Sequence, residues 1–110
     1  MTSARDRMQA DLRTAMKARD SVRVSVLRSA LAALANAEAV VPGDQSSTPV
    51  AFGTTEVPRR ELSEADEHQI LAREIDELQT TADELRQHAR ADDAADLDVR
   101  AMILNEYVHG

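Results

Sequence analysis

Cysteine and tryptophan are missing from this sequence of 110 residues, which has a single tyrosine and a single phenylalanine. The lack of cysteine excludes disulfide bonds, thiolate metal sites and cysteine nucleophiles. So few aromatic rings cannot form the stacking platform on which many proteins bind single-stranded RNA. The three glycines, Gly43, Gly53 and Gly110, are too scattered to form a glycine-rich phosphate loop.

Long apolar segments are also missing. No apolar run approaches the roughly 20 residues that a membrane-spanning helix needs. Charged residues follow Met1–Arg5 directly, so we expect no signal peptide. With 43% hydrophobic and 30% charged residues, the composition is typical of a folded soluble protein. We therefore predict one domain over residues 1–110, in the cytoplasm and without membrane contact.

The net charge of −7 is unevenly spread along the chain. Residues 1–36 carry a balance of +4, and the remainder carries −11. An acidic protein does not bind nucleic acid through its whole surface. Two interpretations remain open: the two halves attract each other within the fold, or the basic segment presents a surface to a polyanion.

Two helices are predicted before the first strong break in the pattern. Ser3 with Asp6 resembles a capping box and predicts a helix near 3–19, and Asp20 as N-cap predicts a second helix near 21–39. Each has an apolar stripe at helical spacing. The stripes consist of Ala4, Met8, Leu12, Ala15 and Met16, and of Val24, Val26, Leu27, Ala30, Leu31, Ala33, Leu34 and Ala37.

Pro42 and Gly43 end the second helix, and residues 40–62 are rich in proline, glycine and serine. We predict a flexible loop there, longer than most connections in compact domains. Ser63 as N-cap with Asp66 then predicts a helix near 64–90, and Asp92 or Asp93 caps a helix near 93–108. Their apolar seams are Leu71, Ile75, Leu78, Ala82, Leu85 and Ala89, and Ala94, Leu97, Ala101, Leu104 and Val108.

No segment has the alternation of a strand, so the sequence predicts an all-α fold that resembles a four-helix bundle. Nineteen alanines against ten leucines allow close helix packing but remove less apolar area from water. We therefore expect a core of modest stability that self-association would strengthen.

One arginine, Arg23, falls inside the apolar arc of the second helix rather than on its polar face. Its guanidinium cannot lose its proton, so we expect a mostly buried side chain that pairs with a carboxylate of another helix. The alternative is an arginine that binds phosphate in a groove. Arg13, Lys17 and Arg28 then extend it into a basic ridge, unless these side chains form an ordinary solvated face.

The sequence contains no recognisable catalytic set. Its serines lack a nucleophile-elbow context, and we predict no catalytic residues and no cofactor. Glu84, His88 and Asp92 follow each other at four-residue steps, but such spacing is common by chance in an acid-rich helix. We predict no metal site.

Short motifs in both halves resemble the YqeY-like family, also called the GatB/YqeY domain family. The first half contributes Met16–Asp20, Arg23, Leu27–Arg28 and Asn36–Glu38. In the second half, Leu62–Glu64 opens a long helix and Ala89–Asp92 stands at the family's Gly-Arg-x-Asp turn. Ile103, Leu104 and Tyr107 match its Ile-Leu-x-x-Tyr-Leu ending, and the connection before Leu62 is usually shorter in the family.

The resemblance implies a helical domain like the tail of the B subunit of aminoacyl-tRNA amidotransferases. In those enzymes the tail helps to hold tRNA while other domains do the chemistry, and relatives are grouped with carbon–nitrogen ligases that use glutamine as amide donor. Typical relatives continue into a further helical subdomain, whereas this sequence ends at Gly110, so we expect a short form of the family.

Two functions therefore remain open. The first is a non-catalytic accessory module with tRNA or amidotransferase subunits as partners, in which Arg13, Lys17, Arg23 and Arg28 are the candidate tRNA-binding residues. The second is a helical protein–protein interaction module with no tRNA role. Convergence of these four side chains in space, away from the acidic helices, would favour the first function, and pairing of each with a carboxylate would favour the second.

Overall fold

The computed structural model describes residues 3–39 and 62–109, and this part of the chain contains four α-helices and no strand. In chain order they are α1 (Ala4–Ala18), α2 (Ser21–Ala39), α3 (Glu64–Gln87) and α4 (Ala91–His109). The predicted all-α fold with four helices is confirmed. The predicted flexible loop over 40–62 lies outside the described residues except for Leu62, which packs against the core.

Three helix starts follow the predicted capping chemistry. The Ser3 hydroxyl accepts a hydrogen bond from the Asp6 backbone N–H at 3.1 Å, and the Asp20 carboxylate accepts one from the Arg23 backbone N–H at 3.1 Å. Ser63 and Asp66 form a complete capping box, with both reciprocal bonds present. Each bond satisfies a backbone donor that the first turn of a helix leaves free.

Two helix ends share one geometry. Arg19 and Ala89 both have a left-handed backbone, with φ of 57° and 58°. In each turn the next residue donates its N–H to a carbonyl five positions earlier, the pattern of a Schellman motif. These bonds run from Asp20 to Ala15 at 3.0 Å and from Arg90 to Leu85 at 2.9 Å.

The second of these turns corrects the predicted helix limits. α3 ends at Gln87 rather than near 90, and α4 begins at Ala91 rather than near 93. Asp92 and Asp93 lie in the first turn of α4, so the prediction that one of them caps it is wrong. The reason is that Ala89 takes up the left-handed conformation for which glycine is the usual signal in a sequence.

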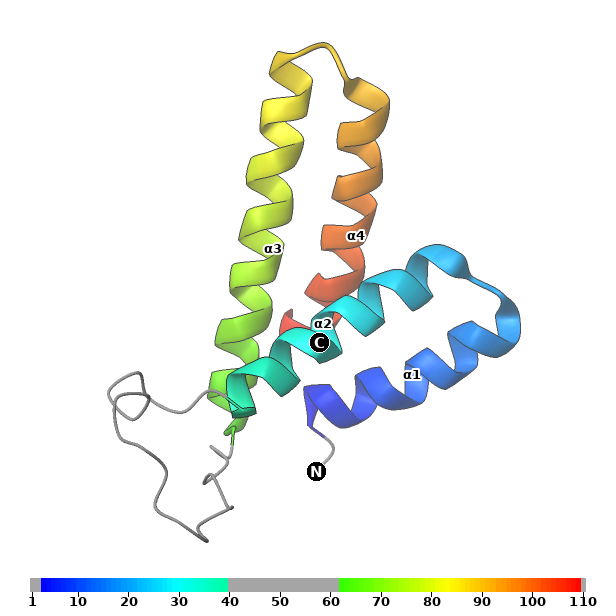
Figure 1. The fold of residues 1–110 in the computed structure, drawn as a ribbon, viewed down its shortest axis with the longest axis vertical. Coiled ribbons are helices and arrows are strands. Elements are labelled where there is room, and N and C mark those ends of the chain that lie inside the picture. The colour runs from blue at the N-terminus through cyan, green and yellow to red at the C-terminus, as the bar shows by residue number, and fades with distance from the viewer. Residues whose placement is uncertain (1–2, 40–61, 110) are drawn as a thin grey trace, which may run out of the picture.

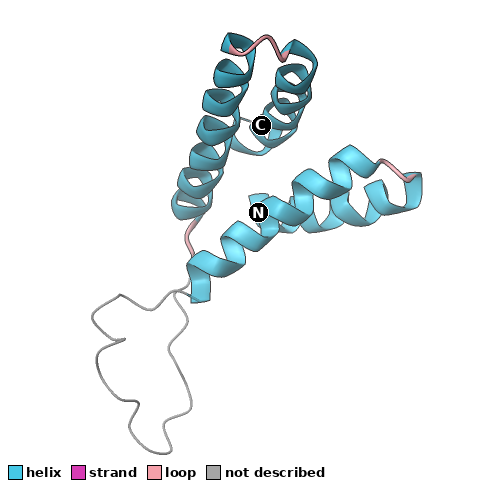
Figure 2. Cartoon of the chain, turned by 45° about the horizontal axis from the view of Figure 1, so that its top comes forward, coloured by secondary structure: helices cyan, strands magenta, loops and turns pink. Residues whose placement is uncertain are grey.

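The helices form two antiparallel hairpins that cross each other (Figure 1). The α1–α2 hairpin lies across the first half of α3 and the second half of α4, and the α3–α4 turn projects beyond it (Figures 1 and 2). α3 and α4 pack along their length, whereas only part of each helix contributes to the contact between hairpins. The crossing leaves an open angle between α2 and the upper part of the α3–α4 hairpin.

The core lies where the hairpins cross and receives side chains from all four helices. Most of the predicted stripe residues are buried or half-buried, but Met16 is 49% exposed, and Ala89 is exposed in the turn after α3. Ile103 and Tyr107 are buried although the predicted seam of α4 omitted them. None of the helices within residues 3–39 and 62–109 combines the length and the hydropathy that a transmembrane span requires.

The start of α1 meets the end of α2 and the start of α3 at one corner of the molecule. Arg5 forms an ion pair with Glu38 at 2.6 Å, and the Arg5 backbone N–H donates to the Glu67 carboxylate at 3.3 Å. Glu67 is only 5% exposed, and its negative charge lies near the positive end of the α1 dipole. These contacts hold the last turn of α2 and the first turn of α3 beside α1.

Candidate functional site

Two of the predicted basic residues, Arg13 and Lys17, lie one turn apart on the outer face of α1. Both side chains are exposed, opposite the face that carries the buried Met8. Neither forms an ion pair with any residue in the described ranges. Their charges therefore face solvent without a partner in this fold.

A third predicted residue, Arg28, lies on α2 close to Arg19, which was not among the predicted site residues. Arg28 and Arg19 line one shallow hollow at the α1–α2 turn, together with Met16 and Val24. Both arginines are exposed, and within the described parts of the chain neither pairs with a carboxylate. The signal for Arg19 in the sequence is its place close to Lys17, at the C-cap of α1.

The fourth residue, Arg23, points away from this hollow and toward α4. Its guanidinium lies 3.4 Å from Glu106 and 3.7 Å from Asp20. The hydrogen bond to Glu106, with that residue's negative charge, raises the pKa of Arg23 despite partial burial. The predicted pairing between helices is present, but the side chain is 33% exposed rather than mostly buried. The reason is that Arg23 lies near the start of α2, at the edge of the shared core.

Next to Arg23, a buried tyrosine joins α4 to α1. The Tyr107 hydroxyl donates to the Asp11 carboxylate at 2.5 Å, and the Arg7 guanidinium lies over the ring, 5.4 Å from its centre. Arg7 also donates to the Tyr107 carbonyl at 3.2 Å. Burial, followed by the hydrogen bond to Asp11, raises the pKa of Tyr107 well above 10. The hydroxyl therefore stays protonated and acts as a structural donor.

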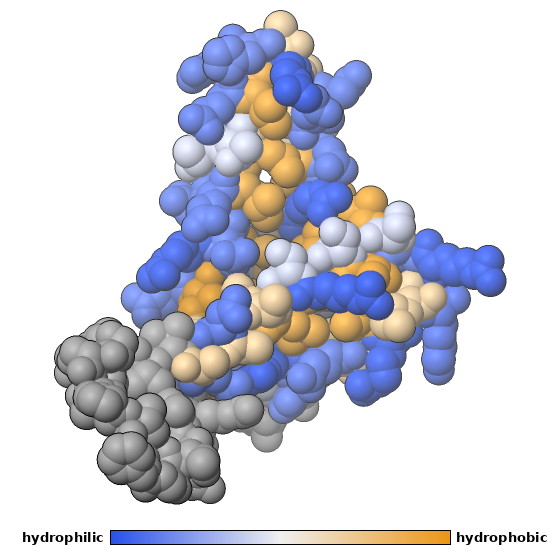
Figure 3. All heavy atoms as spheres, viewed as in Figure 1, coloured by the Kyte–Doolittle hydropathy of each residue, from blue (hydrophilic) through white to orange (hydrophobic). Residues whose placement is uncertain are grey.

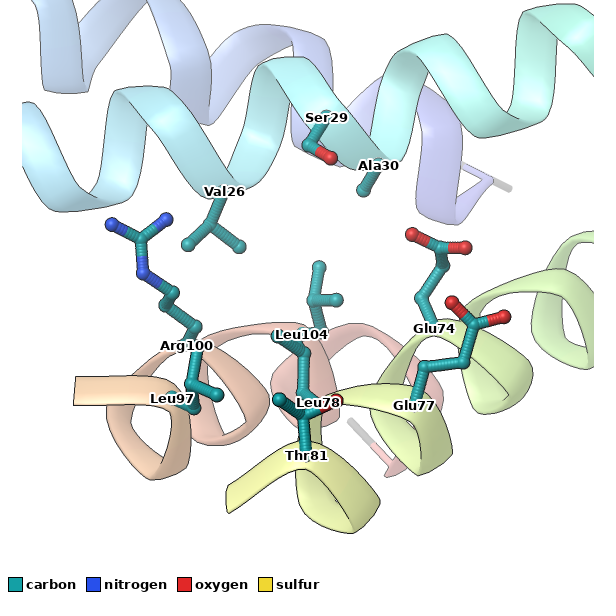
Figure 4. A pocket seen from close by; sticks show the side chains of 10 residues that line it. All are labelled: Val26, Ser29, Ala30, Glu74, Glu77, Leu78, Thr81, Leu97, Arg100 and Leu104. Carbon is teal, nitrogen blue, oxygen red and sulfur yellow. The ribbon is translucent and has the colours of Figure 1, made fainter. Parts of the chain in front are cut away.

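The open angle between the hairpins contains a groove of about 230 Å³. α2 forms one wall, and the facing sides of α3 and α4 form the other (Figure 4). Hydrophobic residues lie in this angle, with hydrophilic ones along the outer sides of the helices (Figure 3). The lining residues are Val26, Ser29, Ala30, Glu74, Glu77, Leu78, Thr81, Leu97, Arg100 and Leu104.

The two ends of the groove carry opposite charges, but only one end is neutralised. Arg100 lies at one end, 3.1 Å from the Asp96 carboxylate and 3.2 Å from the Ser25 hydroxyl. Glu74 and Glu77 lie at the other end (Figure 4), and within the described ranges neither pairs with a basic side chain. Desolvation and the repulsion of Glu77 raise the pKa of Glu74, and Arg73 only partly opposes them. An incoming cation would relieve this repulsion.

The groove has chemistry for binding rather than for a covalent step. In the described part of the chain, neither Ser29 nor Thr81 is hydrogen-bonded to a base that would activate its hydroxyl. Residues 3–39 and 62–109 contain no group of three metal-ligating side chains. Glu84, His88 and Asp92 do not share a helix face, because the chain turns between α3 and α4.

Comparison with known proteins gives one match. A family model described as Yqey-like protein matches residues 5–109, which is nearly the whole chain. No curated protein and no solved structure matches. The matched range includes both hairpins, the basic hollow and the groove.

Proposed function

Because the chain belongs to the Yqey-like protein family, we propose that it is a cytoplasmic, non-catalytic accessory module that binds tRNA through its basic hairpin. In this role it assists a glutamine-dependent amidotransferase, a carbon–nitrogen ligase whose catalytic groups lie in other proteins. The candidate contacts are Arg13, Lys17 and Arg28, with Arg19 added by its place beside Arg28.

One observation carries the proposal. The exposed cations of the α1–α2 hairpin have no carboxylate partner among the described residues, although the protein is strongly acidic. Free guanidinium and ammonium groups can replace the counterions of a phosphate backbone, whereas paired ones must first give up a protein contact. Arg23 is paired with Glu106 and Asp20, so we leave it out of the principal contacts.

Titration of labelled tRNA with the purified chain, at a series of salt concentrations, tests the proposal directly. If three or four phosphates are contacted, the logarithm of the binding constant should fall against the logarithm of salt with a slope of roughly −3. We expect weak binding at physiological salt, because the rest of the molecule repels RNA.

Charge reversals locate the surface. Arg13→Glu, Lys17→Glu and Arg28→Glu should each weaken binding and make the salt slope shallower by about one. Arg73→Glu is the matched control, since Arg73 is also exposed and unpaired within the described ranges but belongs to the acidic hairpin. Tight binding that ignores salt, or equal effects of the control, would show that the site lies elsewhere.

The absence of catalysis is a separate part of the proposal. We expect no amide transfer from glutamine when the chain is assayed alone with misacylated tRNA. Transfer by the purified chain would contradict the accessory role, because the residues described here offer no activated nucleophile.

A second candidate function is a protein-interaction module without a tRNA role. The groove between the hairpins favours it, because its apolar floor and acidic end are suited to a partner's side chains. Absence of any tRNA binding at low salt would favour this function over the first.

A further inference from the structure

The basic hollow and the acidic groove are chemically complementary, although they belong to the same chain. We propose that a second copy of the protein docks here: Met16 of one copy enters the groove of the other, with Arg19 and Arg28 next to Glu74 and Glu77. This contact needs no RNA and does not rest on the function proposed above.

The hollow supplies an apolar group near two cations. Met16 is one of three large hydrophobic residues in the described ranges that remain strongly exposed, and it lies in the last turn of α1. Arg19 and Arg28 border the same hollow, and both are free of carboxylates there. A flexible methionine side chain adapts well to an irregular apolar surface.

The groove supplies the opposite arrangement, an apolar floor next to two anions. Its volume of about 230 Å³ is below that of most drug-sized ligand pockets, so it suits one or two inserted side chains. The charge of Arg100 is already met by Asp96, which leaves Glu74 and Glu77 as the unmatched charges of the groove. Burial and the neighbouring Glu77 raise the pKa of Glu74 and Arg73 offsets this only in part, so a further cation beside Glu74 would favour its charged form.

The position of α2 favours a contact between two molecules. Val26, Ser29 and Ala30 face the groove, whereas Val24 and Arg28 face the hollow on another side of the same helix. The two surfaces lie on different sides of α2 and adjoin at Ser25, which lines the hollow and accepts a hydrogen bond from Arg100 of the groove. Glu74 and Glu77 lie at the other end of the groove, so we assign the contact of Met16 with them to a second molecule. Such a contact is heterologous, so it either closes into a ring or continues head to tail.

Association of the full chain, free of RNA, is measured by sedimentation at low and physiological salt. We expect concentration-dependent association that weakens with salt. Met16→Glu and Glu74→Lys should each weaken it by about tenfold or more, as expected for central interface residues. Met102→Glu is the control, because Met102 is 68% exposed but lies outside both surfaces.

Mixing the two variants gives the decisive result. The Met16→Glu chain keeps an intact groove and the Glu74→Lys chain keeps an intact hollow, so together they should form a one-to-one complex. A second pair, Arg28→Glu and Glu77→Lys, repeats the test if either first variant loses its helical circular dichroism. The proposal is overturned by a wild-type chain that stays monomeric at low salt, by association that both variants retain, or by mixtures that do not associate.

Discussion

The two hairpins differ in how many of their exposed basic side chains form ion pairs. In the α3–α4 hairpin, Arg86 pairs with Asp83 and Asp98, Arg90 pairs with Asp93, and Arg100 pairs with Asp96. In the α1–α2 hairpin, four exposed basic residues have no such partner within the described residues: Arg13, Lys17, Arg19 and Arg28. Acidic residues outnumber basic ones in the α3–α4 hairpin and are fewer than the basic ones in the α1–α2 hairpin. The number of carboxylates nearby therefore decides which basic side chains remain unpaired.

This difference separates two tasks. The acidic hairpin satisfies most of its cations internally and contributes a long packed pair of helices. The basic hairpin packs its inner face across that pair and leaves its outer charges for another molecule. The few polar contacts between the hairpins, such as those of Tyr107 and Arg23, lie close to the shared core.

The largest expected effect comes from removing the core that the hairpins share. Leu27 is fully buried in the cluster to which all four helices contribute. Leu27→Ala should lower the free energy of unfolding by about 2–5 kcal/mol, from lost apolar burial and the cavity left behind. Thermal unfolding followed by circular dichroism should still show one transition for both hairpins. Leu31→Ala, at a half-buried position of the same helix, should cost clearly less; an equal loss would contradict this account.

A smaller loss is expected when the Tyr107 hydroxyl is removed. Tyr107→Phe deletes the bond to Asp11 that joins α4 to α1 and should cost about 1–2 kcal/mol. Because folding raises the pKa of Tyr107, its contribution is fully present below the unfolded value of 10.0 and is lost as pH rises above it. Tyr107→Phe should therefore flatten the fall of stability above that pH.

This tyrosine can be observed directly, because the sequence contains no other. Alkaline titration of the absorbance of the folded chain should show tyrosinate forming only well above pH 10. Ionisation at the ordinary pKa would show that the hydroxyl is neither buried nor bonded to Asp11.

The two left-handed turns allow a direct comparison between the hairpins. Ala89→Gly and Arg19→Gly should each stabilise the protein by roughly 0.5–1 kcal/mol, because glycine adopts a positive φ without strain. Chemical denaturation measures both. Gly substitution at Ala72, in the exposed middle of α3, is the control and should destabilise by a similar amount.

The smallest effect concerns the ion pair between the hairpins. Arg23→Ala should cost only about 0.2–1 kcal/mol, since the guanidinium is one-third exposed. A mostly buried pair, as predicted from the sequence, would have implied on the order of 3 kcal/mol. Thermal melts of both proteins at low and high salt distinguish an exposed pair from a buried one, because a partly exposed ion pair weakens with salt.

Local chemistry made much of the fold predictable. The caps at Ser3, Asp20 and Ser63 are short-range patterns, and the apolar stripes repeat at the helical period. The predicted limits of α3 and α4 were wrong because the left-handed backbone occurs at an alanine, Ala89, and not at a glycine, which would have indicated it in the sequence. The burial of Arg23 was overestimated because a helical wheel gives the direction of a side chain but not how far the neighbouring helix extends.

Contacts between residues far apart in the sequence could not be predicted, for a different reason. Asp11 and Tyr107 are 96 residues apart, and no local pattern links them. The groove exists only because the hairpins cross, so residues of α2, α3 and α4 come together through tertiary packing alone. The placement of Arg19 beside Arg28 depends in the same way on the angle of the α1–α2 turn.

The corner at which Arg5 meets Glu38 and Glu67 also has a consequence for how such a protein can be altered. It holds the end of α2 and the start of α3 together through contacts that do not involve the chain between them. When the two ends are already fixed, each doubling of a connecting segment adds only about 0.6 kcal/mol of closure entropy. We therefore expect the segment between α2 and α3 to tolerate insertions. An epitope, a reporter or a second domain can be inserted there without disturbing either hairpin.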